Sequence, residues 1–411
     1  MTKRKRTILF LTMVALFFLI APAIVFHSQG YRFDFQKKII TQVGGIFIKT
    51  HPKQAEIYLD QKLVQKTDFF FGSVLIKNLL PKSYAVEIKK EGFLSWRKTM
   101  EVRPKEVAEA KGVVLFPSNV QFASITKTAN DFWISPDGKK IIIYEPAANK
   151  TMSWGLKLYS LETNIKSHLI FEKDISSKGA DLMNLEWSPG SKEAYLYVGT
   201  KEQEKKFVLK IDNTSPLLKE AASDTLSEDE IYYLDDAGYL FKQKTKLSQT
   251  PFPIKQETEY KLREFSAYLF LQEDKTLYLF NKNSGIFEKF FDGLESIKIS
   301  PDKKKLVFSS NSEIWLFYLQ DILISPERKA GEKLFLARFS EKIGNVLWLN
   351  PDYLIFNAGE KIIATETNSR DRIQLWNIAS FPDPEISFSE SDKKLYVLSS
   401  NSLYQSEPLL K

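Results

Sequence analysis

The sequence predicts an all-β protein that is carried on a single N-terminal transmembrane helix. A small β-sandwich comes first, followed by a β-propeller of about seven blades. Three observations predict this fold. An almost unbroken apolar run occupies residues 8–26. Apolar and polar residues alternate with period two over residues 44–116, which indicates half-buried strands. From residue 117 to residue 411, a strand–turn–strand pattern built on Ser-Pro-Asp recurs.

The apolar run at residues 8–26 directly follows four basic residues, 3–6. At 1.5 Å per residue this run spans roughly 28 Å, close to the ~30 Å thickness of bilayer hydrocarbon. The basic residues favour a cytoplasmic N-terminus. We therefore expect residues 1–7 to form a cytoplasmic tail, residues 8–26 to cross the cell membrane once, and the bulk of the chain to be extracytoplasmic.

Two other interpretations of the apolar run stay open. Ala21-Pro22-Ala23 resembles the small-x-small site of a cleaved signal peptide. The apolar run continues through residues 24–26, which favours an uncleaved anchor. A core helix of a cytoplasmic globular protein is the weaker alternative, because a core helix rarely lacks a polar face.

Composition excludes several classes of site. The chain has 58 Lys and Arg against 51 Asp and Glu; setting aside the four N-terminal basic residues leaves 54 against 51, a net charge of +3. That ordinary surface predicts no nucleic-acid partner. The absence of cysteine excludes disulfides, thiolate metal sites and a cysteine nucleophile. His27, His51 and His168 are far apart without metal-like spacing, so we expect each to be satisfied or solvent-facing, and no metal or cofactor.

Residues 27–43 are polar and are predicted to be a linker. After them, alternating segments predict about six short strands over residues 44–116, which is typical of a small antiparallel sandwich. This span resembles the PEGA domain, a small surface-associated β-module. The resemblance rests on Ile46-x-Ile48-x-Thr50-x-Pro52, Ala55-x-Ile57-Tyr58-Leu59-Asp60, Leu79-x-Pro81 and Glu91-Gly92-Phe93.

Two positions depart from the PEGA pattern. The tetrapeptide that names the family reads Pro52-Lys53-Gln54-Ala55, and the usual Pro-Gly turn reads Pro81-Lys82. The resemblance implies a bacterial or archaeal envelope context, and a structural or binding role rather than catalysis.

The second half of the chain repeats itself. The clearest copies are Trp133–Tyr144 and Ile297–Phe308, in which proline presets φ for the second turn position and Asp or Gly tolerates the next. Seven units of about 42 residues are the signature of a propeller. An array of β-sandwiches is the alternative, and six or eight blades stay open. The motif resembles TolB-like and WD-repeat-like propellers of bacterial envelopes. The other copies are Leu185–Lys192, Trp348–Phe356, Ile386–Leu395, Ser227–Leu234 and Phe265–Leu271.

A second turn and a third strand follow most copies. Residues 309–312 precede such a strand, and so do residues 235–238. The last copy, from Ile386, has too few residues after it for four strands, and an exposed sheet edge there is a liability. We therefore predict that Val120–Ile125 supplies the outer strand of the final blade and closes the ring.

No catalytic motif appears. There is no Gly-x-Ser-x-Gly elbow, phosphate-binding loop or dinucleotide fingerprint. The acidic groups Asp137, Asp302 and Asp235-Asp236 occupy positions where turns favour Asp, so we expect turns rather than a metal site. Trp96 and Trp154 are most simply packing residues, with exposed sugar- or peptide-binding platforms as the alternative. No catalytic, cofactor or metal residue is assigned, and the ligand-binding residues are unknown.

Two functions follow as expectations. The first is a non-enzymatic, membrane-anchored binding or scaffolding protein, with a propeller face that engages a protein or a cell-wall polymer. The second is a propeller hydrolase or lyase that acts on envelope glycan or peptide. The second requires carboxylates with raised pKa values at the central mouth of the propeller. A relay sensor is less favoured, because the cytoplasmic part has about seven residues.

Overall fold

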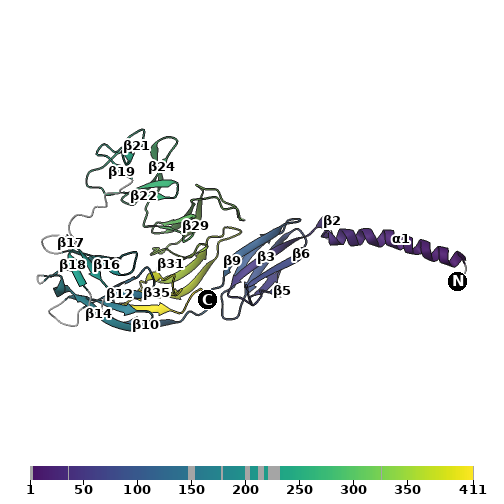
Figure 1. Ribbon diagram of the computed structural model, residues 1–411, viewed down its shortest axis with the longest axis horizontal. Coiled ribbons are helices and arrows are strands. Elements are labelled where there is room, and N and C mark those ends of the chain that lie inside the picture. The colour runs from purple at the N-terminus through teal and green to yellow at the C-terminus, as the bar shows by residue number, and fades with distance from the viewer. Residues whose placement is uncertain are drawn as a thin grey trace.

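The computed structural model describes residues 3–35, 37–146, 153–176, 179–199, 204–211, 217–220, 232–324 and 326–410. Figure 1 shows three parts in a row: a protruding helix, a small domain of strands, and a large domain of several sheets. Strands make up most of the described structure, as predicted, and the helical content is small.

The N-terminal helix α1 extends over Lys3–Ser28 and includes Pro22. Its large apolar side chains are exposed on all sides, from Ile8 to Phe26. It is long and apolar enough to cross a membrane, and a signal sequence has the same length and composition.

The residues predicted as a linker are more ordered than expected. They form an antiparallel hairpin of β1 (Tyr31–Asp34) and β2 (Ile39–Gln42). The period-two alternation in Tyr31-Arg32-Phe33-Asp34 accounts for the first strand. Because the segment is short and mostly polar, composition alone indicated a linker.

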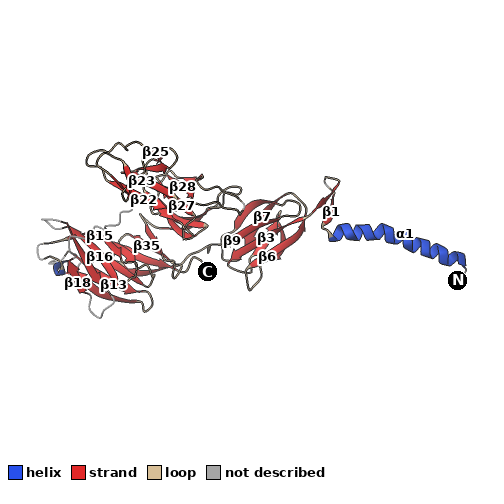
Figure 2. Cartoon of the chain, turned by 45° about the horizontal axis from the view of Figure 1, so that its top comes forward, coloured by secondary structure: helices blue, strands red, loops and turns tan. Residues whose placement is uncertain are grey.

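The small domain is a two-sheet sandwich, and in Figure 2 it lies between the hairpin and the large domain. Its sheets have the strand orders β5-β4-β7-β8 and β6-β3-β9. The predicted purely antiparallel sandwich of about six strands is wrong in one respect. β9 pairs parallel with β3, because the chain leaves β8 of one sheet and enters the other sheet running in the direction of β3. The strands are β3 (Gly44–His51), β4 (Glu56–Leu59), β5 (Lys62–Lys66), β6 (Ser73–Leu79), β7 (Ser83–Lys89), β8 (Trp96–Glu101) and β9 (Val107–Val114).

The large domain consists, in the described residues, of six four-stranded sheets and one three-stranded sheet, each antiparallel. This succession is propeller-like. The first four sheets along the chain are β11 (Asp131–Ile134), β12 (Lys140–Pro146), β13 (Trp154–Ser160), β14 (Ile165–Phe171); β15 (Asp181–Trp187), β16 (Glu193–Gly199), β17 (Glu204–Lys210), β18 (Leu217–Glu220); β19 (Tyr232–Leu234), β20 (Leu240–Lys242), β21 (Thr245–Lys246); and β22 (Tyr260–Phe265), β23 (Tyr268–Glu273), β24 (Thr276–Asn281), β25 (Ile286–Phe291).

Three more sheets follow, and a short 3-10 helix, Glu172–Asp174, comes after β14. These sheets are β26 (Ser296–Ile299), β27 (Lys305–Ser309), β28 (Glu313–Tyr318), β29 (Lys333–Arg338); β30 (Leu347–Asn350), β31 (Tyr353–Ala358), β32 (Lys361–Glu366), β33 (Leu375–Ser380); and β34 (Glu385–Phe388), β35 (Leu395–Ser399), β36 (Ser402–Ser406) with β10 (Phe122–Thr126).

Buried apolar clusters join the sheets in chain order, and the sheet of β34–β36 also shares a cluster with the sheet of β11–β14. Among the described residues, no shared cluster joins the sheets of β15–β18 and β19–β21. First strands of successive sheets are also linked directly. The indole of Trp187 donates to the carbonyl of Trp133 at 3.1 Å, and that of Trp348 donates to the carbonyl of Lys298 at 3.2 Å.

The Ser-Pro-Asp turns connect the first and second strands of their sheets, as predicted. The hydroxyl of Ser300 donates to Oδ1 of Asp302 at 2.6 Å and accepts the backbone N–H of Lys305 at 2.9 Å. Ser135 makes the equivalent bonds in the first sheet. The turn at residues 235–238 was predicted to precede a third strand. In the described residues this turn joins β19 to β20. Residues 227–231 of the same copy lie outside the described residues.

The predicted closing strand is confirmed. β10 pairs antiparallel with β36, with Phe122 opposite Ser406 and Ala123 opposite Gln405. It forms the edge of that sheet opposite β34. The sheet therefore combines residues from both ends of the large domain.

Candidate binding site at the domain junction

The small and large domains share one buried core. Phe116 follows the last strand of the small domain, and its ring lies 5.7 Å from that of Tyr353 and 5.5 Å from that of Trp376. The Trp376 indole donates to the carbonyl of Ser95 at 3.1 Å, and the hydroxyl of Tyr353 accepts the N–H of Val114 at 3.0 Å. These contacts hold both domains in one orientation.

A fully buried ion pair crosses this junction. Nζ of Lys98, on β8, lies 2.7 Å from a carboxylate oxygen of Glu366, at the end of β32, and their side chains are 0% and 2% exposed. Lys98 also donates to the carbonyls of Asn368 and Arg372 at 2.9 and 2.6 Å. Burial raises the pKa of Glu366, although Lys98 opposes the shift. The indole of Trp96 donates to the same carboxylate at 3.1 Å.

The loop after β32 covers the edge strand of the small domain. β8 is the outer strand of its sheet. Its Arg97 N–H donates to Oε1 of Gln374 at 2.9 Å, and its Thr99 N–H donates to Oδ2 of Asp371 at 3.1 Å. Unpaired strand edges invite association with other chains. Here side chains of the large domain satisfy two of the backbone donors.

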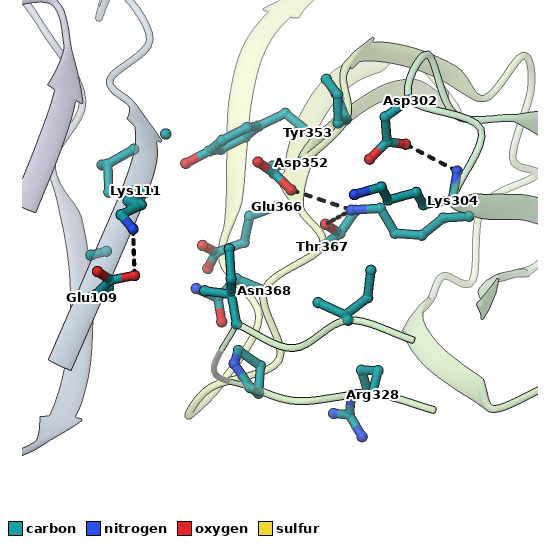
Figure 3. Close-up of a pocket in the computed structure, with 18 of the residues that line it drawn as sticks. Glu109, Lys111, Asp302, Lys304, Arg328, Asp352, Tyr353, Glu366, Thr367 and Asn368 are labelled. Atoms are coloured by element: carbon teal, nitrogen blue, oxygen red, sulfur yellow. Dashed lines mark hydrogen bonds and ion pairs between the residues drawn. The ribbon is translucent and has the colours of Figure 1, made fainter. Parts of the chain in front are cut away.

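A cavity of about 290 Å³ lies where the two domains meet. Figure 3 shows Glu109 and Lys111 of β9 on one side, and Tyr353 and Glu366 of the large domain on the other. The remaining walls come from the first turns of two neighbouring sheets, residues 302–305 and 351–353, and from the loop between β28 and β29. The first turns of these two sheets therefore face the small domain.

The charged groups of this cavity are mostly paired with one another. Lys305 Nζ lies 3.2 Å from Oδ1 of Asp352. Lys111 Nζ lies 2.6 Å from Oε2 of Glu109 (Figure 3). Arg328 bonds to Ser369 and lies 3.6 Å from the Glu332 carboxylate. The cavity thus offers amino, guanidinium and carboxylate groups within a small space.

Apolar groups complete the lining. The loop between β28 and β29 contributes Ile322 and the exposed Ile324. Burial raises the pKa values of Tyr318 and Tyr353, so both phenols stay neutral at physiological pH. Charged, hydroxyl and apolar groups together are suited to hold a short polar segment that has some apolar surface.

Carboxylates also occur at the starts of two first strands. Asp131 begins β11 and Glu385 begins β34, in sheets that share a buried cluster. Burial raises the pKa of Asp131. Burial also raises the pKa of Glu385, and the charges of Asp131 and Asp383 raise it further. In the part of the chain that the structure describes, no group of three or more His, Asp or Glu could hold a metal ion.

A second cavity, of about 320 Å³, lies near the C-terminal ends of the first strands β26 and β34, whereas Asp131 and Glu385 stand at N-terminal ends. Lys298, Trp348, Phe388 and Glu390 are among the residues that line it. Burial lowers the pKa of Lys298. Titratable groups with shifted pKa values therefore occur near both ends of the first strands.

The structure confirms some of the predictions made for individual residues and contradicts others. The alternative that Trp96 and Trp154 are exposed platforms is wrong: both are buried, and the Trp154 indole donates to the carbonyl of Ala180 at 2.6 Å. Asp137, Asp302 and Asp235 accept turn hydrogen bonds, as predicted. The side chains of His27, His51 and His168 are exposed.

Sequence reasoning missed the groups at the junction. Lys98 and Glu366 are separated by 268 positions, and Lys305 meets Asp352 only because neighbouring sheets place their first turns together. One signal was available. In the alternating strand Trp96–Glu101, Lys98 has the same parity as the apolar Trp96 and Met100, so its side chain faces the core and requires a buried partner.

Residues 43–114 match the family model of the PEGA domain. No curated protein matches the chain. Among solved structures, the β-propeller domain of Myceliophteria thermophila Cps50 (Swd1) aligns with a TM-score of 0.38 and 10% sequence identity, over 71% of this chain and 99% of that one. The resemblance to TolB-like propellers stays a prediction. The match to the family model shows that the chain contains a PEGA domain, in the part of the sequence where its motifs predict one.

Proposed function

We propose that this protein is a membrane-anchored, extracytoplasmic binding or scaffolding protein of the prokaryotic cell envelope. α1 crosses the membrane once with its N-terminus inside. The seven sheets are the blades of one propeller, and the PEGA domain holds that propeller outside the membrane. The partner is a protein or a cell-wall polymer.

The observation that carries this proposal is the junction between the PEGA domain and the propeller. The buried Lys98–Glu366 pair and the ring contacts of Phe116 fix the propeller relative to the PEGA domain. A flexible tether is sufficient for an enzyme that acts on a diffusing substrate. A defined orientation favours a protein that presents one face to a fixed partner.

The junction cavity supplies a binding site with suitable chemistry. Lys304 offers a cationic group, Thr367 and Asn368 offer neutral polar groups, and the β28–β29 loop offers apolar surface. These groups fit an extended peptide or glycan segment that carries carboxylates.

The test uses the full-length protein in detergent, with Lys304→Glu as the variant. Immobilised protein is incubated with isolated cell-wall polymer and, separately, with solubilised envelope proteins. We expect one of these to be retained by the wild type and lost from Lys304→Glu. Lys289→Glu, on a different sheet and exposed, is the matched control and is expected to retain it. No retention by the wild type, or equal retention by all three proteins, contradicts the proposal.

The second candidate is a propeller hydrolase or lyase, and the carboxylates Asp131 and Glu385 favour it. Their raised pKa values are the property that a general acid requires. Release of soluble fragments from labelled envelope glycan or peptide, abolished by Glu385→Gln in a folded variant, supports this function. The absence of turnover by the wild type removes it.

A further inference from the structure

The hairpin β1–β2 carries an apolar face that no part of the described chain covers. Phe33 lies opposite Ile40, and cross-strand partners project to the same face of a hairpin. Phe35 follows Phe33 with its ring centroid 5.0 Å away. The exposed fractions are 47% for Phe33, 82% for Phe35 and 67% for Ile40. Exposed large apolar groups gathered in one place mark an interaction surface.

This face continues from the surface of α1. The ring of Phe26, in the last turns of the helix, lies 5.5 Å from that of Tyr31, the first residue of β1. Tyr31 has the same strand parity as Phe33. An aromatic strip therefore runs from the outer end of the helix along the hairpin, and Figure 1 shows the hairpin between the helix and the PEGA domain.

Other contacts fix the orientation of the hairpin. Asp34, of opposite parity, is buried and accepts the N–H of Lys37 at 3.1 Å. Lys37 Nζ also donates to the Pro81 carbonyl of the PEGA domain, at 3.4 Å. On the helix side, Arg32 donates to the carbonyl of His27 at 2.9 Å. The side of the hairpin opposite the apolar strip is thus tied to the rest of the chain.

We propose that the apolar face of the hairpin, formed by Tyr31, Phe33, Phe35 and Ile40, lies in the outer acyl–headgroup boundary of the bilayer. This inference rests on the proposed anchoring by α1. The amphipathic ring of Tyr31 favours that layer, the apolar side chains of Phe33, Phe35 and Ile40 can be buried at its acyl side, and basic groups such as Lys38 interact favourably with its phosphates. The hairpin then sets the height of the PEGA domain above the membrane.

Position distinguishes this face from another group of exposed aromatic residues, which lies in the PEGA domain. Phe69, Phe70 and Phe71 are also exposed. They precede β6, and the N–H of Thr50, near the end of β3, donates to the carbonyl of Gly72. This places them at the end of β3 farthest from the hairpin, where no bilayer is expected.

The test exploits the absence of cysteine from the chain. Full-length single-cysteine variants Phe35→Cys, Phe17→Cys and Phe70→Cys carry a nitroxide spin label. They are reconstituted in vesicles of phosphatidylethanolamine and phosphatidylglycerol. Collision rates with oxygen and with a water-soluble nickel chelate then report the depth of each label. We expect the Phe17 label in the hydrocarbon. The Phe35 label should be several-fold less accessible to nickel than the Phe70 label.

A Phe35 label as accessible to nickel as the Phe70 label, with the Phe17 label buried, overturns the inference but leaves the anchor intact. A Phe17 label open to nickel overturns both. Ile40→Cys, on the same face, repeats the measurement and guards against a misfolded Phe35 variant. Shielding that is lost when the protein is diluted with lipid assigns the face to a second copy of the chain, and also overturns the inference. Shielding independent of dilution supports it.

Discussion

At the scale of single residues, the junction depends on the buried ion pair of Lys98 and Glu366. A buried ion pair contributes little compared with a well-packed apolar pair, whereas loss of one partner leaves an uncompensated buried charge. Lys98 and Glu366 illustrate this asymmetry, because four hydrogen bonds from Trp96, Gln374 and Lys98 itself depend on their positions.

We predict that Lys98→Met lowers the free energy of unfolding by about 3 kcal/mol. The Glu366 carboxylate then stays buried without a cation. The double variant Lys98→Met with Glu366→Gln should regain part of the loss, because the amide carries no charge. Chemical denaturation of the full chain in detergent measures both. The exposed pair Lys289–Asp292 is the control, and Lys289→Met should lower the free energy of unfolding much less, because water solvates both groups. Equal losses from Lys98→Met and Lys289→Met contradict the prediction.

In the loop that presents Phe69 to Phe71, one carboxylate accepts several backbone hydrogen bonds. Backbone N–H groups of Phe71, Ser73 and Phe70 donate to Asp68 and lower its pKa to about 2. Because the folded pKa lies below the ordinary value of 3.8, the carboxylate stabilises the protein fully above about pH 4. That contribution is lost as the pH falls through about 2.

The stability difference between the wild type and Asp68→Ala should therefore depend on pH. We expect the wild type to be more stable by a constant amount above about pH 4, and the difference to shrink toward pH 2. Denaturant titrations at a series of pH values measure it. A difference that stays constant down to pH 2 means that Asp68 does not order the loop by its charge.

At the scale of elements, the turns could be predicted from the sequence, whereas the pairing of strands that are distant in sequence could be predicted only in part. The Ser-Pro-Asp turns were predictable because Ser300, Asp302 and the following backbone satisfy one another within five residues. β10 was predictable because the last sheet lacked a strand. The hairpin β1–β2 was missed because its strands have only four residues each. The parallel placement of β9 was missed because periodicity indicates a strand but not its direction or its partner. The junction was not predictable, because its partners lie in different sheets.

The closing sheet can be tested with a disulfide. Ala123 of β10 and Gln405 of β36 are directly opposite, and such residues have Cβ atoms about 5 Å apart, near the range that a disulfide requires. We predict that Ala123→Cys with Gln405→Cys cross-links under mild oxidation, seen as a mobility shift on a denaturing gel that reduction removes. Ala123→Cys with Ser400→Cys, in the turn between β35 and β36, should not cross-link. Equal cross-linking of both pairs contradicts the strand order.

At the scale of the whole molecule, the PEGA domain and the large domain share a single apolar core. The cluster that contains Ile48 and Trp96 of the PEGA domain continues without a break through Tyr353, Trp376 and Ile378 of the large domain. Independent domains joined by a linker bury separate cores. Because the core is continuous, we expect neither domain to adopt its complete folded structure without the other.

Two truncations test this interdependence. Removal of residues 1–42 takes away α1 and the hairpin but leaves the shared core, so we expect the thermal midpoint to stay near that of the full chain. Removal of residues 1–116 exposes Tyr353 and Trp376, and truncation of packing around one such ring costs on the order of 3 kcal/mol. We therefore expect a midpoint lower by several degrees, together with binding of a hydrophobic dye. Equal midpoints for the two truncations would show that the domains are energetically independent and that the junction does not fix the orientation of the large domain.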